Sequence, residues 1–202
     1  RVNLGVLLTQ TGDFAAAEPL LTEAAASRAR RLGVRHPLTI DADNSVALLW
    51  LAQGRLQDSL ERFEDVLERS VEAHGEDHVA CGRVLCSLGQ VKTQLGRFGD
   101  AERDLRASLS ILQGRLGEEH AWTLLAANNL AACLFGTNRL QEALPLRERT
   151  LAAQRRVLGA EHPETLLSMS NLASLYDRLG RGEDAERLGR ETLAIEERVL
   201  GP

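Results

Sequence analysis

Apolar residues recur along this chain at the spacing of one face of an α-helix. Leu124, Ala127 and Ala131 are an example, because successive members lie three or four residues apart. No segment alternates apolar and polar residues as a half-buried strand would, and aromatic residues make up only 3% of the chain. The pattern therefore predicts an all-α protein.

The helical pattern repeats with a fixed period. A glycine recurs every 42 residues, and a histidine follows three residues after each of the first four glycines. A fixed period of about 20–50 residues is typical of repeat arrays. We therefore expect residues 1–202 to form a single array, cut at both ends from a longer protein, with units at about 1–35 (incomplete), 36–77, 78–119, 120–161 and 162–202. The repeated residues are Gly33, Gly75, Gly117, Gly159 and Gly201, with His36, His78, His120 and His162.

Each unit carries the signals of two helices joined by a turn. Pro163 suits the first position of a helix, where its missing N–H costs nothing. Gly180 suits a left-handed residue that ends the first helix, and Asn138, the next-best residue, holds that position one unit earlier. The histidines are interpreted as helix starts and not as a metal site. Successive repeats would place them about 10 Å apart, whereas the ligand nitrogens of a zinc site all lie within about 2 Å of the ion.

Residues that occupy the same position in successive units form a column. Two side-chain arrangements follow from such columns. Trp50 shares a column with Tyr176 and is expected in the core. Opposite charges four residues apart are expected to pair on the outer face of the last helix. The pairs are Glu183–Arg187 and Glu186–Arg190.

Two other repeat classes have a similar period. Propeller blades of about 40–45 residues need four strands each, which this pattern does not supply. HEAT and armadillo units of about 40–47 residues lack this order of Asn-Leu-Ala, glycine turn and alanine. Both classes fit poorly.

The repeat resembles the tetratricopeptide repeats of kinesin light chains over essentially the whole chain. This resemblance implies a right-handed α-solenoid, in which stacked antiparallel helix pairs form a superhelix with the first helices on its concave face. The predominance of arginine, with Lys92 as the only lysine, indicates a bacterial protein. The resemblance rests on Asn128-Asn129-Leu130-Ala131, His162-Pro163-Glu164-Thr165-Leu166 and Asn171-Leu172-Ala173-Ser174-Leu175-Tyr176.

The family's inward columns, carried onto this chain, give a candidate peptide groove. Amides suit peptide backbone because each can donate and accept a hydrogen bond. The column of Asn3, Asn129 and Asn171 is therefore interpreted as gripping a ligand, although it could instead join neighbouring repeats. The candidate groove residues are Asn3, Asp41, Asn44, Arg83, Ser87, Gln90, Asn128, Asn129, Asn171, Ser174 and Asp177.

Two aromatic residues are possible ligand anchors. Trp122 stands where other repeats hold Leu38, Ala80 and Glu164, so the fold does not require it, and it either binds a partner or packs on a loop. Phe135 lies among the inward residues. The groove columns lack a basic cluster, which favours a weakly charged ligand with apolar anchors.

Composition narrows the class of protein further. The net charge of −5 argues against nucleic acid. No apolar run reaches the roughly 18–20 residues that span a bilayer, and no signal peptide opens the chain. Three cysteines without a CxxC motif favour a reducing cytoplasm. No phosphate loop, nucleophile elbow or metal-ligand set occurs, so neither enzyme activity nor a cofactor is expected.

These observations predict a non-catalytic scaffold that binds a protein or peptide. One alternative is a regulatory array that controls a neighbouring NTPase or signalling domain of the same chain. Another is a module that associates end to end, because uncapped repeats expose apolar faces.

Overall fold

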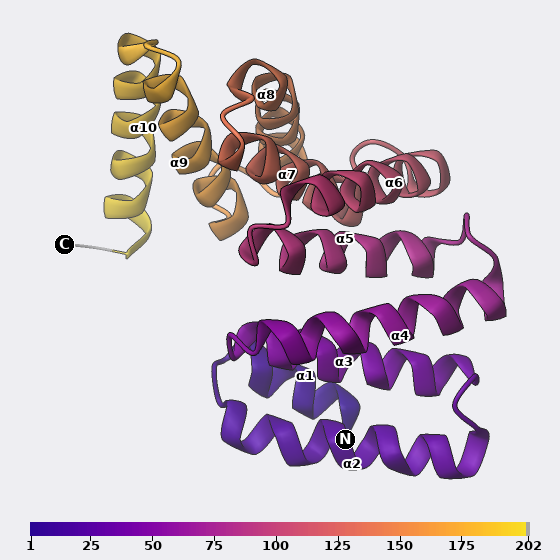
Figure 1. The fold of residues 1–202 in the computed structure, drawn as a ribbon. Coiled ribbons are helices and arrows are strands. Elements are labelled where there is room, and N and C mark those ends of the chain that lie inside the picture. Colours follow the sequence, from indigo (N-terminus) through magenta and orange to yellow (C-terminus); the bar gives the residue numbers. More distant parts are fainter. Residues whose placement is uncertain (201–202) are drawn as a thin grey trace. The chain divides into compact units, whose positions relative to one another are not determined.

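The computed structural model describes residues 1–200, without the side chain of residue 200. Gly201, the last glycine of the repeat, lies outside the described residues. The described chain is entirely helical apart from turns and caps, which confirms the all-α prediction (Figure 1). Its helices are α1 (Val2–Gln10), α2 (Phe14–Leu32), α3 (Pro37–Ala52), α4 (Leu56–His74), α5 (Val79–Gln94), α6 (Phe98–Leu116), α7 (Ala121–Gly136), α8 (Leu140–Val157), α9 (Pro163–Arg178) and α10 (Gly182–Leu200).

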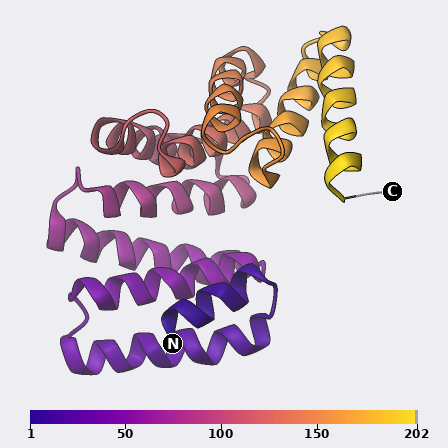
Figure 2. The ribbon, with the colours of Figure 1, turned by 180° about the vertical axis from the view of Figure 1, so that it is seen from behind.

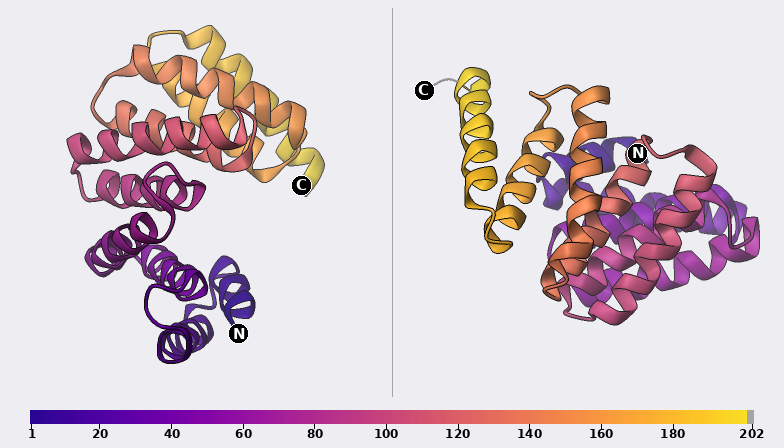
Figure 3. Two further views of the ribbon diagram at one scale, coloured as in Figure 1. Left: turned by 90° about the vertical axis from the view of Figure 1, so that its right-hand side faces the viewer. Right: turned by 90° about the horizontal axis from the view of Figure 1, so that it is seen from above.

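The chain divides into two compact units. The N-terminal unit is Arg1–Ile111 and the C-terminal unit begins at Leu112, within α6. In the N-terminal unit each of α1 to α4 packs on the next helix, and α3 also contacts α1 and α5. Figure 2 shows these helices from behind, and the left view of Figure 3 looks nearly along them. In the C-terminal unit α8 contacts α7 and α9, and α9 contacts α10.

A histidine caps the first helix of every complete repeat. Its Nδ1 accepts a hydrogen bond from the backbone N–H two residues later, at 3.2 Å in each case. Such a cap satisfies one of the N–H groups left free at a helix start. The predicted role as helix starts is therefore confirmed, and Pro37 and Pro163 occupy first helical positions. The capping residues are His36, His78, His120 and His162.

The turn between the two helices of a repeat uses a left-handed residue, as predicted. Gly54 has φ 75°, and Asn138 has φ 61° at the equivalent position. Asparagine tolerates this conformation because its short polar side chain bonds locally. Among the described residues, Asn138 is the one non-glycine with positive φ.

Small residues let the helices of the N-terminal unit approach closely. A Cβ added to Gly89 of α5 would stand 2.3 Å from Cγ of Leu105 on α6. Ser59 of α4 donates a hydrogen bond to the Ala47 carbonyl oxygen of α3 at 2.9 Å, which requires near contact of the two backbones. Gly89 and Ser59 thus each allow close contact of two helices at these crossings.

Two expected arrangements differ in the structure. Trp50 was expected in the core but is half-buried at its edge, where the Arg62 guanidinium lies 5.3 Å from its ring centroid. Arg187 pairs with Asp184 at 2.6 Å instead of with Glu183. The other predicted pair, Glu186–Arg190, is present at 2.5 Å.

Candidate binding surfaces

The exposed sides of the first helices carry most of the predicted groove residues; we call this surface the first-helix face. In the N-terminal unit it belongs to α1, α3 and α5, and neighbouring members contact each other. Asn3, Asp41 and Arg83 are exposed, and Asn44 and Gln90 are half-buried.

Ser87, by contrast, offers little surface to a ligand. It is 7% exposed, and its hydroxyl donates to the Arg83 carbonyl oxygen at 3.4 Å.

The first-helix face of the C-terminal unit combines amides with exposed leucines. Leu125 of α7 and Leu167 of α9, which occupy one column of the repeat, are 40% and 58% exposed. Asn128 and Asn171, which follow these leucines by about one helical turn, are half-buried. Within the described chain, the amides of these two residues make no hydrogen bond to protein atoms. Asn129 is also half-buried, and Ser174 and Asp177 of α9 are exposed.

The two aromatic candidates are both half-buried. Trp122 follows the first residue of α7, and its backbone N–H donates to the capping His120. Phe135 lies near the end of α7, with the guanidinium groups of Arg147 and Arg178 at 5.7 and 4.7 Å from its ring centroid. These distances are those of cation–π contacts.

Arg147 of α8 is a buried charge that was not predicted from the sequence, because only the inward columns of the first helices were considered. It is 6% exposed, and within the described chain its Nε and Nη1 are enclosed without a hydrogen-bond partner. Burial lowers the pKa of its guanidinium, since removal from water disfavours the charged form. The same column holds Leu21, Phe63 and Leu105, so a column-by-column comparison of the second helices would have revealed it.

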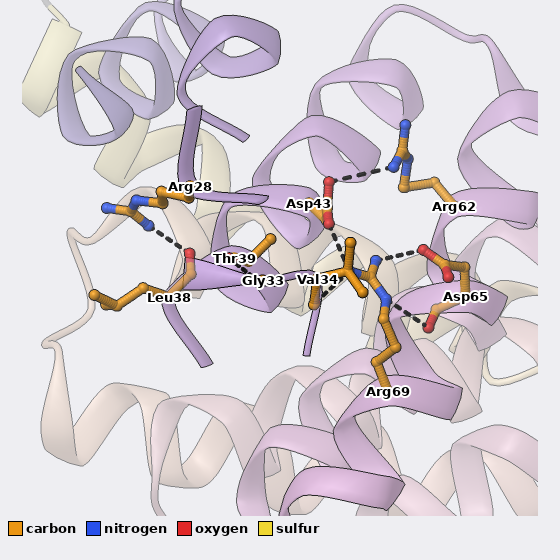
Figure 4. A network of polar contacts seen from close by, with 9 residues as sticks. All are labelled: Arg28, Gly33, Val34, Leu38, Thr39, Asp43, Arg62, Asp65 and Arg69. Carbon is orange, nitrogen blue, oxygen red and sulfur yellow. Dashed lines mark hydrogen bonds and ion pairs between the residues drawn. The ribbon is translucent and has the colours of Figure 1, made fainter. Parts of the chain in front are cut away.

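A polar network in the N-terminal unit was likewise missed. Asp43 of α3 accepts hydrogen bonds from Arg69 at 2.8 Å and from Arg62 at 3.2 Å (Figure 4). Arg69 also donates to the Val34 carbonyl oxygen at 2.9 Å and pairs with Asp65. The network borders a cavity of about 390 Å³ between α2, α3 and α4.

Burial raises the pKa of the Cys81 thiol, which keeps it protonated and unreactive. The residues that the structure describes contain no cluster of metal-ligating side chains. None of the described helices is both long and apolar enough to cross a bilayer.

Helix pairs joined by similar turns and repeated at a fixed period define the class of all-α solenoid repeat proteins. Sequence profiles described as tetratricopeptide repeat match residues 1–38, 40–114, 87–153 and 122–198. The chain belongs to the tetratricopeptide repeat family.

Solved structures support the expected subtype. A putative kinesin light chain with nearly identical TPR-like repeats, from Podosopora anserina, is 25% identical with a TM-score of 0.76, covering 100% of this chain and 95% of that one. BtubC (BKLC) from P. vanneervenii is 26% identical with a TM-score of 0.81, covering 98% and 79%. MamA AMB-1, at 16% identity and a TM-score of 0.62 over 98% of both chains, shows the fold alone. No curated protein matches the chain.

Proposed function

We propose that this protein is a non-catalytic scaffold that binds an extended peptide segment of a partner along the first-helix face. The observation that carries the proposal is the surface of α7 and α9, where exposed Leu125 and Leu167 lie near the unpaired amides of Asn128 and Asn171. Leucines supply apolar contact area, and each amide can pair with a peptide unit of any sequence.

The charges of this face favour a ligand of mixed or weak charge. Arg178 is exposed beside Asp177, and in the N-terminal unit Arg83 and Asp41 are both exposed. Neither sign predominates among these residues. The three cysteines are unpaired, which supports a cytoplasmic location.

A peptide library tests this function. Displayed random peptides of about 12 residues, which span roughly 40 Å in extended form, would be selected on the wild-type protein. Asn171→Ala and Leu167→Ser should each weaken capture of the selected peptides. The matched control is Gln141→Ala, which removes an exposed amide from the second helix α8. Equal capture by all these variants, with unchanged helicity, would contradict the proposal.

Self-association is a second candidate function, favoured by α1. Leu4 and Leu7 are 52% and 54% exposed, whereas the equivalent Val46 and Leu49 are buried at 2% and 0%. A second copy could cover these leucines with its own terminal repeat. Light scattering should then show a mass that rises with concentration in the wild type and stays monomeric in Leu7→Glu. A constant wild-type mass would refute this candidate.

A further inference from the structure

The cavity between α2, α3 and α4 exists because α2 has small side chains. Its α2 wall includes Ala25, Ala26 and Ala29, and Val34 and Val46 add further apolar surface. The volume of about 390 Å³ is ample for one long side chain. Every other repeat has a leucine in the column of Ala25: Leu67, Leu109, Leu151 and Leu193.

The floor of the cavity is polar, unlike the equivalent positions of the later repeats. Asp43 and Arg69 form a pair whose side chains are each 10% exposed. The equivalent pairs in later repeats are apolar, so the fold itself does not require charge at these positions. Those pairs are Leu85 and Ile111, Ala127 and Ala153, and Met169 and Ile195.

The charges of the floor neutralise each other. Both oxygens of Asp43 accept hydrogen bonds, one from Arg62 and one from Arg69. Arg69 is further occupied by the Val34 carbonyl and by Asp65. An incoming group therefore meets a floor without net charge, and the surrounding rim determines which sign of charge is favoured.

The rim is acidic. Glu61, Asp65 and Glu68 lie on the exposed face of α4 at helical spacing. Glu61 accepts a hydrogen bond only from the neutral amide of Gln57, and Glu68 forms no ion pair within the described chain.

A second cavity adjoins the first along α4. It measures about 410 Å³ and shares Arg62 and Asp65 with the first. Its other lining residues include Trp50, Asp58 and Glu61, so acids outnumber bases there. The two cavities thus share a wall on α4, and along this wall Asp58, Glu61 and Asp65 outnumber the arginines Arg62 and Arg69.

We propose that the α2–α4 cavity is a docking pocket for an arginine or lysine side chain of a partner protein. Such a side chain has an aliphatic stem, which suits Ala26 and Val34, and a cationic head, which suits Glu61 and Glu68. An acidic side chain is repelled by the same carboxylates. None of the candidate groove residues lines this cavity, so it is separate from the proposed peptide site on the first-helix face.

The test uses three matched synthetic peptides in the same alanine and serine background, carrying three arginines, three glutamates or three glutamines. Calorimetric titration of the whole chain should detect the arginine peptide alone, with affinity that falls as salt rises. Ala25→Leu, which restores the leucine of the other repeats, should weaken binding about fivefold or more, and so should the double change Glu61→Gln with Glu68→Gln. The matched controls are Ala152→Leu on α8 and Glu183→Gln on α10, both exposed, which should leave the affinity unchanged.

Unchanged arginine-peptide binding by Ala25→Leu, or equal binding of the glutamate or glutamine peptide, would overturn the pocket. So would the absence of arginine-peptide binding to the wild type. If Ala25→Leu loses its helical circular dichroism, Ala29→Val takes its place, because the equivalent residue on α4 is Val71. Leu167→Ser should bind the arginine peptide normally, which separates failure of this pocket from failure of the first-helix site.

Discussion

Replacing Arg147 with leucine should stabilise the protein. The guanidinium is 6% exposed, and within the described chain two of its nitrogens are enclosed without a partner. Each unsatisfied buried donor costs about 1–3 kcal/mol. Three equivalent positions already hold Leu21, Phe63 and Leu105, so the column accepts a large apolar side chain.

Two losses reduce the gain. The cation–π contact with Phe135 at 5.7 Å contributes about 0.5–2 kcal/mol, and leucine fills less space than arginine. Replacement of a buried charge by an apolar residue has typically gained about 1–4 kcal/mol. We therefore expect Arg147→Leu to raise the free energy of unfolding by about 1–3 kcal/mol.

Equilibrium unfolding in urea, followed by circular dichroism, measures this change. The control is Arg149→Leu on the same helix, because Arg149 is exposed and pairs only with exposed Glu118, at 3.0 Å. That variant should stay within about 0.5 kcal/mol of the wild type. Because repeat arrays can unfold in steps, hydrogen exchange of α7 to α9 would check that the gain is local. If Arg147→Leu is destabilising while the control is neutral, the reasoning from unsatisfied donors is wrong.

Three further changes test other parts of the structure. Gly89→Ala places a methyl 2.3 Å from Cγ of Leu105, so thermal unfolding should show a loss of about 1–3 kcal/mol; an unchanged midpoint would mean that the helices separate freely. Asp43→Ala removes one of the two carboxylates that pair with buried Arg69 and should cost about 1–3 kcal/mol in urea unfolding, and a loss below about 0.5 kcal/mol would contradict the structural role of the pair. Hydrogen bonds to the Glu18 carboxylate, chiefly the one from the Gln53 side-chain amide, hold the pKa of Glu18 below its ordinary 4.5. Its stabilising effect is therefore present above pH 4.5 and is lost as pH falls through the lower folded pKa, so Glu18→Gln should flatten the acid side of a stability–pH curve; equal curves would exclude Glu18 as a contributor.

The backbone of this protein was predictable because local chemistry specifies it. A left-handed turn admits few residue types, so Gly54 and Asn138 reveal the helix ends in the sequence alone. The histidines could be placed at helix starts by spacing, although the capping hydrogen bond of Nδ1 could not be foreseen.

The side-chain networks were less predictable, since they depend on partners in other helices. Trp50 shares a column with Tyr176, which predicts a core position, but the column does not reveal its contact with Arg62 of α4. Asp43 and Arg69 lie 26 residues apart, and only the packing of α3 on α4 brings them together. The column that makes Ser87 a groove candidate does not reveal that the residue is only 7% exposed.

The histidine caps also bear on how such a chain can change length. Each cap joins residues only two positions apart, so every repeat carries all the groups that its own first helix needs to begin. Duplication or loss of a 42-residue unit would therefore leave no helix start unsatisfied. The buried pair of Asp43 and Arg69 also lies within one unit, but Arg69 additionally bonds Val34 of the unit before. Because that bond is to a backbone carbonyl, which any residue at the position supplies, it too leaves the order of the repeats free.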